Sequence, residues 1–216
     1  GEGTLPEERW ALGAAATGER EKSWALPEME FDFYYLKGVA ENVLRGLKIK
    51  NFAFRATSGL AWYHPGRSAA ILVNGKEIGT VGEVHPIVLE NYGIDQKTSA
   101  FQLDLDLLAK EAVEGINYEP LPRYPAVSRD LAVVIPEEAE AAEVIRVIRN
   151  NRETLLKQVR LFDLYRGKQI EPGYKSMAFA LSWQAEDRTL TDEEVNGLHQ
   201  DILTDLAEIF GAKIRV

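Results

Sequence analysis

Within residues 175–184, bulky apolar side chains alternate with small ones, the clearest pattern in this chain. Such alternation predicts a strand with one buried face, because successive side chains of a strand point to opposite sides. The bulky side of this strand consists of Met177, Phe179, Leu181 and Trp183. The opposite side consists of small residues, namely Ser176, Ala178, Ala180 and Ser182.

The neighbouring segments complete a domain around this strand. Apolar runs and helical spacing predict strands over residues 131–135, 159–165 and 212–216, and a helix over residues 140–150. Thr191 and Glu194 have the spacing of a capping box, which begins a second helix, and Gly211 ends it. The resulting order, β-α-β-β-α-β, is that of the ferredoxin-like fold.

Both helices of a ferredoxin-like fold cover the same face of its sheet, so we expect the bulky side of residues 175–184 to meet them. The small side is then left open, and a flat partner such as a nucleic-acid base can approach the backbone there. An ordinary solvated face, or one that docks on another domain, has the same pattern. The alternation by itself favours these ordinary uses.

The first half of the chain predicts an antiparallel sheet with helices on one side. Strands are predicted over residues 9–17, 68–73, 78–84 and 101–105. Asn74 and Gly75 separate two of them, and this pair is typical of a tight hairpin because both positions of its turn need positive φ. A helix is predicted after Asp32, a good N-cap, and a shorter one over residues 86–92. The chain as a whole is therefore expected to be α+β.

A proline-rich segment divides the two halves. Pro120, Pro122 and Pro125 lie within six residues, which disfavours regular pairing of the backbone. We predict domains over residues 1–118 and 123–216, with a linker at 119–122.

Composition narrows the classes of function. The chain has 216 residues, of which 45% are hydrophobic and 27% charged, and its formal net charge is −9. Residues 120–216 carry 13 Lys and Arg against 16 Asp and Glu, so neither half is basic. That balance argues against non-specific nucleic-acid binding, which depends on Lys and Arg at the phosphates. No apolar run is long enough for a membrane span, so no membrane partner is expected.

The same composition also indicates where the protein works. The chain has no cysteine, which excludes disulfides and thiolate chemistry and agrees with a cytoplasmic location. No secretory signal precedes the first strand, and the sequence begins with Gly1 instead of Met, so we expect a fragment of a longer protein.

Catalytic and metal-binding motifs are weak. His64 and His85 lie on either side of the predicted hairpin with Glu83 nearby, but each histidine precedes a proline, which is more typical of a structured turn than of a metal site. No nucleophile elbow and no glycine-rich phosphate loop occurs. We therefore predict neither catalytic nor metal-ligating residues. The cations that flank the predicted strands of the second half could hold phosphates, although each could equally pair with a nearby carboxylate: Arg123, Arg129, Arg160, Arg166 and Lys175.

Several motifs resemble those of the beta chain of bacterial phenylalanyl-tRNA synthetase. In the second half they are residues 123–132 (RYPAVSRDLA), 161–167 (LFDLYRG), 173–178 (GYKSMA) and 187–195 (DRTLTDEEV). These resemble the ferredoxin-fold anticodon-binding domain at the C-terminus of that chain. In the first half they are residues 31–39 (FDFYYLKGV), 64–69 (HPGRSA) and 79–86 (GTVGEVHP), which are similar to the catalytic-like module before it.

The resemblance implies a function. The family enzyme joins phenylalanine to tRNA-Phe with ATP and Mg²⁺, and its chemistry resides on the alpha chain of an α₂β₂ tetramer. This chain would then be a non-catalytic C-terminal fragment, with no cofactor of its own, consisting of an inactive class II synthetase-like module and an anticodon-binding domain.

The expected contacts follow from the strand pattern and the quoted motifs. Residues expected to bind RNA are Arg129, Asp130, Arg160, Arg166, Lys175, Ser176, Ala178 and Ser182. Residues expected to dock on the alpha chain are His64, Arg67 and His85. Two alternatives remain. An acylphosphatase-like enzyme would need a phosphate loop after the first strand of the domain, where Glu137 and Glu138 would instead repel phosphate, and a protein-docking module would have no RNA role.

Overall fold

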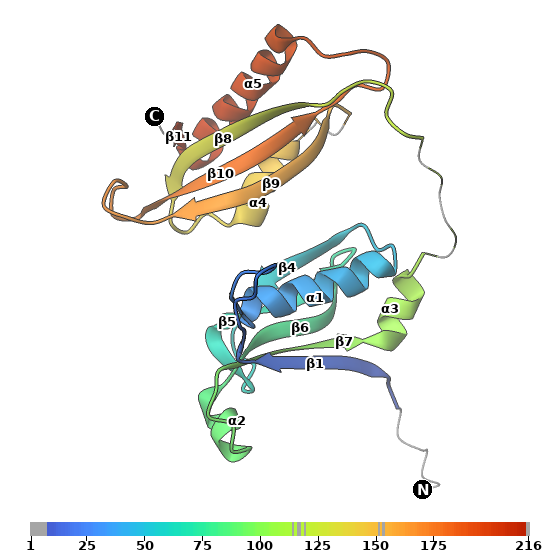
Figure 1. Ribbon diagram of the computed structural model, residues 1–216, viewed down its shortest axis with the longest axis vertical. Coiled ribbons are helices and arrows are strands. Elements are labelled where there is room, and N and C mark those ends of the chain that lie inside the picture. The colour runs from blue at the N-terminus through green and yellow to red at the C-terminus, as the bar shows by residue number, and fades with distance from the viewer. Residues whose placement is uncertain are drawn as a thin grey trace, which may run out of the picture. The chain divides into compact units, whose positions relative to one another are not determined.

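The computed structural model describes residues 8–113, 115, 118, 120–150, 152 and 154–214, and has the α+β class that the sequence predicts. The chain separates into two compact units, residues 1–117 (the first unit) and 118–216 (the second unit), as Figure 1 shows. Glu119 of the predicted linker lies outside the described residues. No helix in the described part of the chain has the length and hydropathy to cross a membrane.

The first unit is built on a five-stranded sheet in which every neighbouring pair is antiparallel. Its strands, in spatial order, are β1 (Ala11–Thr17), β7 (Thr98–Asp104), β6 (Lys76–Val84), β5 (Tyr63–Val73) and β4 (Phe52–Ala56). A small ribbon of β2 (Glu19–Arg20) and β3 (Met29–Glu30) adjoins this sheet in the sequence. The helices are α1 (Phe33–Gly46), α2 (Pro86–Asn91) and α3 (Leu105–Glu111).

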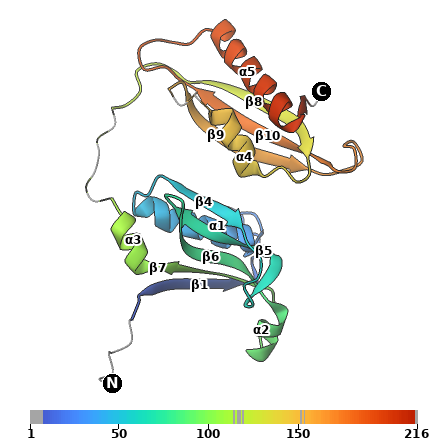
Figure 2. The same cartoon turned by 180° about the vertical axis from the view of Figure 1, so that it is seen from behind.

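Helix α1 covers one face of this sheet, as Figures 1 and 2 show from opposite sides. The Asp32 side chain accepts a hydrogen bond from the Tyr35 backbone N–H at 2.9 Å, which confirms the predicted N-cap. Leu36, Ala40 and Leu44 then point into a core that includes Ile71, Val81 and Phe101 from the sheet. Burial of one apolar stripe of α1 against one sheet face therefore forms this core.

The predicted hairpin between β5 and β6 is confirmed. Val73 pairs with Lys76, so the loop consists of Asn74 and Gly75. Both residues have positive φ, 49° and 78°, as the predicted turn requires.

The end of β7 differs from the prediction. Leu105, expected to continue the strand, is the first residue of α3, because the Asp104 side chain accepts a hydrogen bond from the Leu107 backbone N–H at 2.9 Å. The alternation of apolar and polar residues continues past Asp104, but this N-cap ends the strand. The sequence also gave no prediction for β4 or α3, both of which are short.

We expect substitution by alanine to change the stability of the first unit in opposite directions at two of its glycines. An added Cβ at Gly79 would lie 2.2 Å from the Gln102 carbonyl oxygen, whereas one at Gly38, inside α1, meets nothing within 4 Å. We expect Gly79→Ala to lower the unfolding free energy of this unit by about 2–3 kcal/mol. Gly38→Ala should raise it by about 0.5–1 kcal/mol. Hydrogen exchange of the β6 and β7 amides measures both changes, and equal effects of the two substitutions would contradict this packing.

The second unit has the predicted β-α-β-β-α-β order. Its elements are β8 (Val127–Pro136), α4 (Ala141–Arg149), β9 (Leu156–Tyr165), β10 (Tyr174–Trp183), α5 (Asp192–Phe210) and β11 (Lys213–Ile214). The sheet order is β11-β8-β10-β9 with antiparallel neighbours throughout. The predicted last strand, 212–216, includes Arg215 and Val216, which lie outside the described residues.

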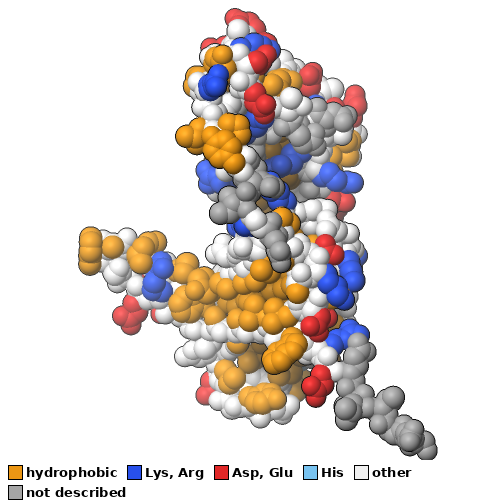
Figure 3. Space-filling view, turned by 90° about the vertical axis from the view of Figure 1, so that its right-hand side faces the viewer, with side chains coloured by type: hydrophobic (Ala, Val, Ile, Leu, Met, Phe, Trp, Pro, Cys, Tyr) orange, Lys and Arg blue, Asp and Glu red, His pale blue; other side chains and the backbone are white. Residues whose placement is uncertain are grey.

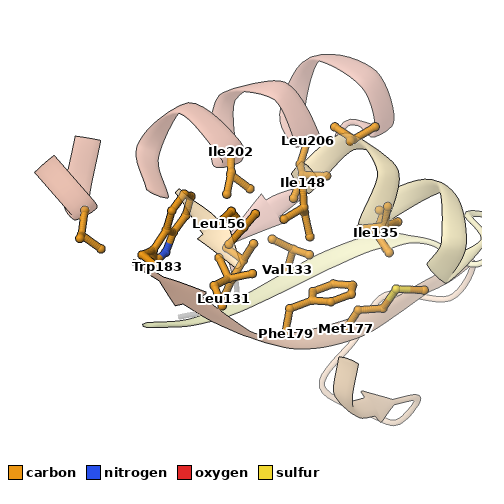
Figure 4. Packing of buried hydrophobic residues seen from close by; sticks show 14 of the residues in the cluster. Leu131, Val133, Ile135, Ile148, Leu156, Met177, Phe179, Trp183, Ile202 and Leu206 are labelled. Atoms are coloured by element: carbon orange, nitrogen blue, oxygen red, sulfur yellow. The ribbon is translucent and has the colours of Figure 1, made fainter. Parts of the chain in front are cut away.

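Both helices of the second unit pack on one sheet face, and Figure 4 shows the core between the layers. The strands contribute Val133, Phe179 and Trp183, and the helices contribute Ile148 and Ile202, all 0–1% exposed. This confirms the expectation that the bulky side of residues 175–184 meets the helices.

Helix α5 has the predicted ends. Thr191 accepts from the Glu194 backbone N–H at 3.3 Å, and the Glu194 carboxylate accepts from the Thr191 N–H at 2.9 Å. Gly211 ends the helix with φ of 64°. An ion pair of 2.6 Å between Arg152 and Asp205 joins the segment after α4 to α5.

Candidate nucleic-acid interface

The second unit leaves one face of its sheet without a helix. Strand register determines which residues share this face, because cross-strand partners point to the same side. Ala178 of β10 lies between Ala132 of β8 and Asp163 of β9, and Ala180 lies between Asp130 and Arg160. We call this surface the open face. Its residues are Ser128, Asp130, Ala132 and Val134 of β8, Ser176, Ala178, Ala180 and Ser182 of β10, Gln158, Arg160, Asp163 and Tyr165 of β9, and Lys213 of β11.

Strand β9 gives the open face the predicted Arg160 and an aromatic group, Tyr165, that the sequence did not indicate. The register with β10 shifts between Ala178 and Phe179, so Phe162 has no partner of its own in the pairing. Phe162 is 47% exposed. Tyr165 is half-buried and pairs with Ser176. Only the register of β9 on β10 places Tyr165 on the open face, because β9 itself shows no clear alternation of apolar residues.

The small centre of this face agrees with the sequence prediction in part. Ala178 and Ser182 are half-buried and Asp130 is exposed, so all three are accessible. Ser176 is only 2% exposed, because it lies between the larger side chains Val134 and Tyr165. Ser176 therefore does not form part of the accessible surface.

Two of the predicted cations are also directed away from the open face. Lys175 is 7% exposed and donates to the Glu137 carbonyl oxygen at 2.5 Å. Arg129 lies on the helix side of β8, as the burial of Leu131 two residues later indicates, and its guanidinium pairs with Asp192 at the start of α5. Among the predicted arginines, the open face itself holds Arg160.

Arg166 lies at the end of the sheet, where it pairs with Glu137. Its Nε donates to Glu137 Oε1 at 2.8 Å, and an Nη lies at the same distance from this oxygen. This guanidinium lowers the pKa of Glu137 below its ordinary value. Arg166 therefore ties the β9–β10 loop to the end of β8.

The Glu137–Arg166 pair predicts a measurable titration. A carboxyl whose folded-state pKa is lowered keeps its contact above its unfolded pKa and loses it as pH falls through the folded value. We expect the Glu137 side-chain carbon to titrate in NMR at a lower pH than an ordinary glutamate. Arg166→Gln should raise that midpoint toward the ordinary value. Glu194 is the control. Hydrogen bonds from Thr191 and Arg188 lower its pKa at the start of α5, and its titration midpoint should not change in Arg166→Gln. An unchanged Glu137 midpoint in Arg166→Gln would contradict the pairing.

The open face combines three kinds of chemistry. Its small centre allows a flat ring close to the backbone, and Tyr165 provides an aromatic surface at β9. Asp130 and Asp163 are exposed acceptors for N–H groups. Arg160 is exposed and makes no ion pair within the described part of the chain. This set suits unstacked bases of a single strand better than a duplex, which needs a continuous basic surface.

The residues expected to dock on a partner lie in the first unit. Arg67 donates to both carboxylate oxygens of Glu83 at 2.8 Å. His85 is the N-cap of α2, and its Nδ1 accepts from the Ile87 N–H at 3.2 Å. His64 lies in β5 with its Nδ1 buried and without a hydrogen-bond partner in the described structure. Within the described ranges, no group of three His, Asp or Glu side chains is arranged to hold a metal.

A cleft of about 1160 Å³ also opens in the first unit. Lys37 and Arg67 are among its lining residues, and both are engaged: Lys37 pairs with Glu41 and lies 4.4 Å from the Phe54 ring, while Arg67 pairs with Glu83. These ion pairs argue against their use as phosphate ligands.

Comparison with known proteins identifies related sequences for both units. The family model "Phenylalanyl tRNA synthetase beta chain CLM domain" matches residues 1–105, and "Ferredoxin-fold anticodon binding domain" matches residues 122–215. The chain is 40% identical over 210 residues to the phenylalanine–tRNA ligase beta subunit of Moorella thermoacetica, and 40% identical over 216 residues to that of Staphylococcus epidermidis. These alignments cover 97% and 100% of the chain but 26% of each relative. The chain thus spans about a quarter of the length of the relatives that it matches.

Proposed function

Since this chain belongs to the family of phenylalanyl-tRNA synthetase beta chains, we propose that it is part of a phenylalanine–tRNA ligase and that its second unit holds the anticodon of tRNA-Phe. The complete enzyme attaches phenylalanine to tRNA-Phe with ATP in the cytoplasm. In this proposal the chain contributes recognition, and the catalytic residues lie elsewhere in the enzyme.

The observation that carries the proposal is the open face of the second unit. Strands β8 and β10 present small side chains at its centre, and β9 adds Arg160 and Tyr165 along one side. Anticodon bases unstack readily, so they can lie flat on such a centre and stack against the Tyr165 ring. Asp130 and Asp163 accept hydrogen bonds from base N–H groups, and Arg160 contacts a phosphate.

The second unit carries more Asp and Glu than Lys and Arg, which agrees with recognition of RNA by a few specific contacts and not by a basic surface. Phosphate contacts are few, so binding should depend only moderately on salt and strongly on which bases the face meets. Of the residues expected from the sequence, Asp130, Arg160, Ala178 and Ser182 are accessible for this role, and Arg166 acts at the end of the sheet.

Arg160→Ala tests the phosphate contact. We expect the affinity of the complete enzyme for tRNA-Phe to fall about threefold to tenfold, and the slope of log K against log salt to decrease by about 0.7, as for one lost contact to a single strand. Filter binding across a salt series measures both quantities. Arg149→Ala, which removes an exposed arginine of α4 in the helix layer, is the control for net charge. Equal changes in both variants would rule out a local phosphate contact on the open face.

We further propose that the first unit docks on the alpha chain of an α₂β₂ enzyme. Large hydrophobic side chains are exposed on this unit, among them Trp10, Trp24, Tyr34, Trp62 and Tyr92, each more than half exposed. Figure 3 shows a wide band of hydrophobic side chains across one side of it. Exposed apolar surface of this extent is typical of a protein interface. His64, Arg67 and His85 remain candidate contacts, with Arg67 held by Glu83.

ATP and Mg²⁺ belong to the complete enzyme in this proposal. Within the described residues, no group of three His, Asp or Glu side chains is placed to hold a metal ion. We propose that ATP and Mg²⁺ bind to the alpha chain, where the chemistry of the family resides.

A further inference from the structure

Tyr165 and Gly167 are in direct contact at the edge of the open face. A Cβ built on Gly167 would lie 2.3 Å from Tyr165 Oη and 2.5 Å from its Cζ. Both distances are far below a van der Waals contact, so the phenol end of the ring lies against the Gly167 backbone. Gly167 is not among the glycines with positive φ, so the requirement for glycine here comes from space and not from backbone conformation.

The loop that carries Gly167 is tied down at both ends. Arg166 pairs with the Glu137 carboxylate at 2.8 Å, and the Glu137 N–H donates to the Gly173 carbonyl oxygen at 2.9 Å. Within the loop, the Ile170 N–H donates to the Gly167 carbonyl oxygen at 2.9 Å. These contacts hold the Gly167 backbone in place, so a side chain added there would displace the Tyr165 ring more readily than the loop.

We propose that Gly167 is a positioning residue for Tyr165: the absence of a side chain at Gly167 sets the orientation in which the Tyr165 ring meets an anticodon base. This inference rests on the proposed function, in which the open face holds the anticodon. Stacking depends on the plane of the ring, so a displaced ring loses contact with the base although Tyr165 is still present.

Steady-state aminoacylation of tRNA-Phe by the complete enzyme provides the test. We expect Tyr165→Ala to raise the KM for tRNA-Phe about tenfold and Gly167→Ala to raise it about fivefold, in the range of one lost base–aromatic stack. In both variants kcat should stay within about twofold of the wild type, because the chemistry lies elsewhere. Gly197→Ala makes the same substitution in α5, where an added Cβ meets nothing within 4 Å, and should leave KM unchanged.

The double variant separates positioning from a general structural effect. If Gly167 acts through Tyr165, Gly167→Ala should have no further effect on KM in a Tyr165→Ala background. Full additivity of the two substitutions would overturn the inference, as would an unchanged KM in Gly167→Ala when Tyr165→Ala raises it. An unchanged KM in Tyr165→Ala would instead count against the proposed function of the open face, and the positioning role would fail with it.

Discussion

Replacing Ala178 by glutamate is expected to weaken the binding of tRNA-Phe to the complete enzyme about tenfold or more. Ala178 lies at the centre of the open face, with Ala132 on one side and Asp163 on the other. A glutamate there would fill the space that a flat base needs, and its charge would repel the neighbouring phosphates. Filter binding or the KM for tRNA-Phe in aminoacylation measures the loss.

A matched substitution distinguishes this effect from a change in net charge. Ala207 is exposed on α5, in the helix layer, and Ala207→Glu alters the charge by the same amount. We expect Ala207→Glu to change the affinity less than twofold, and both variants to keep a melting temperature near that of the wild type. Similar losses of affinity in the two variants would show that the open face has no special part in binding.

The adjacent residue on β10 should behave in the opposite way. Phe179 points from the other side of the strand into the core between the sheet and the helices, where it is 0% exposed (Figure 4). Phe179→Ala is expected to lower the unfolding free energy of the second unit by about 3–5 kcal/mol, through lost burial and the cavity that remains. Trp183 is fully buried in this core, whereas the other tryptophans of the chain are exposed. The blue-shifted part of the tryptophan fluorescence therefore comes from Trp183, and its loss in urea measures the unfolding of the second unit.

Phe179→Leu is the conservative control. It keeps an apolar side chain in the same place, so we expect a much smaller loss, of about 1–2 kcal/mol. A loss below about 1 kcal/mol for Phe179→Ala would mean that this face of β10 does not carry the core of the unit.

The alternation along β10 predicts from the sequence which of these two residues faces the core. Period-two alternation assigns each residue to one side of a strand, and the β-α-β-β-α-β order states which side the helices cover. Burial of Phe179 and the position of Ala178 on the face without helices follow from these two facts.

Other features depend on contacts that no local pattern records. Ser176 is buried by its cross-strand neighbours, although its place in the alternation is that of Ala178. Tyr165 joins the open face through the register of β9 on β10, which a bulge shifts. In each case a long-range partner decides the accessibility of the side chain.

The most direct test compares how tightly two proteins bind two tRNAs that differ only in the anticodon. The affinity of the complete enzyme for tRNA-Phe and for the same tRNA with a substituted anticodon would be measured for the wild type and for Ala178→Glu, at one salt concentration. We predict that the wild type discriminates between the two tRNAs by tenfold or more, and that this ratio falls toward one in Ala178→Glu. A ratio that is the same in both proteins would contradict the claim that the open face holds the anticodon.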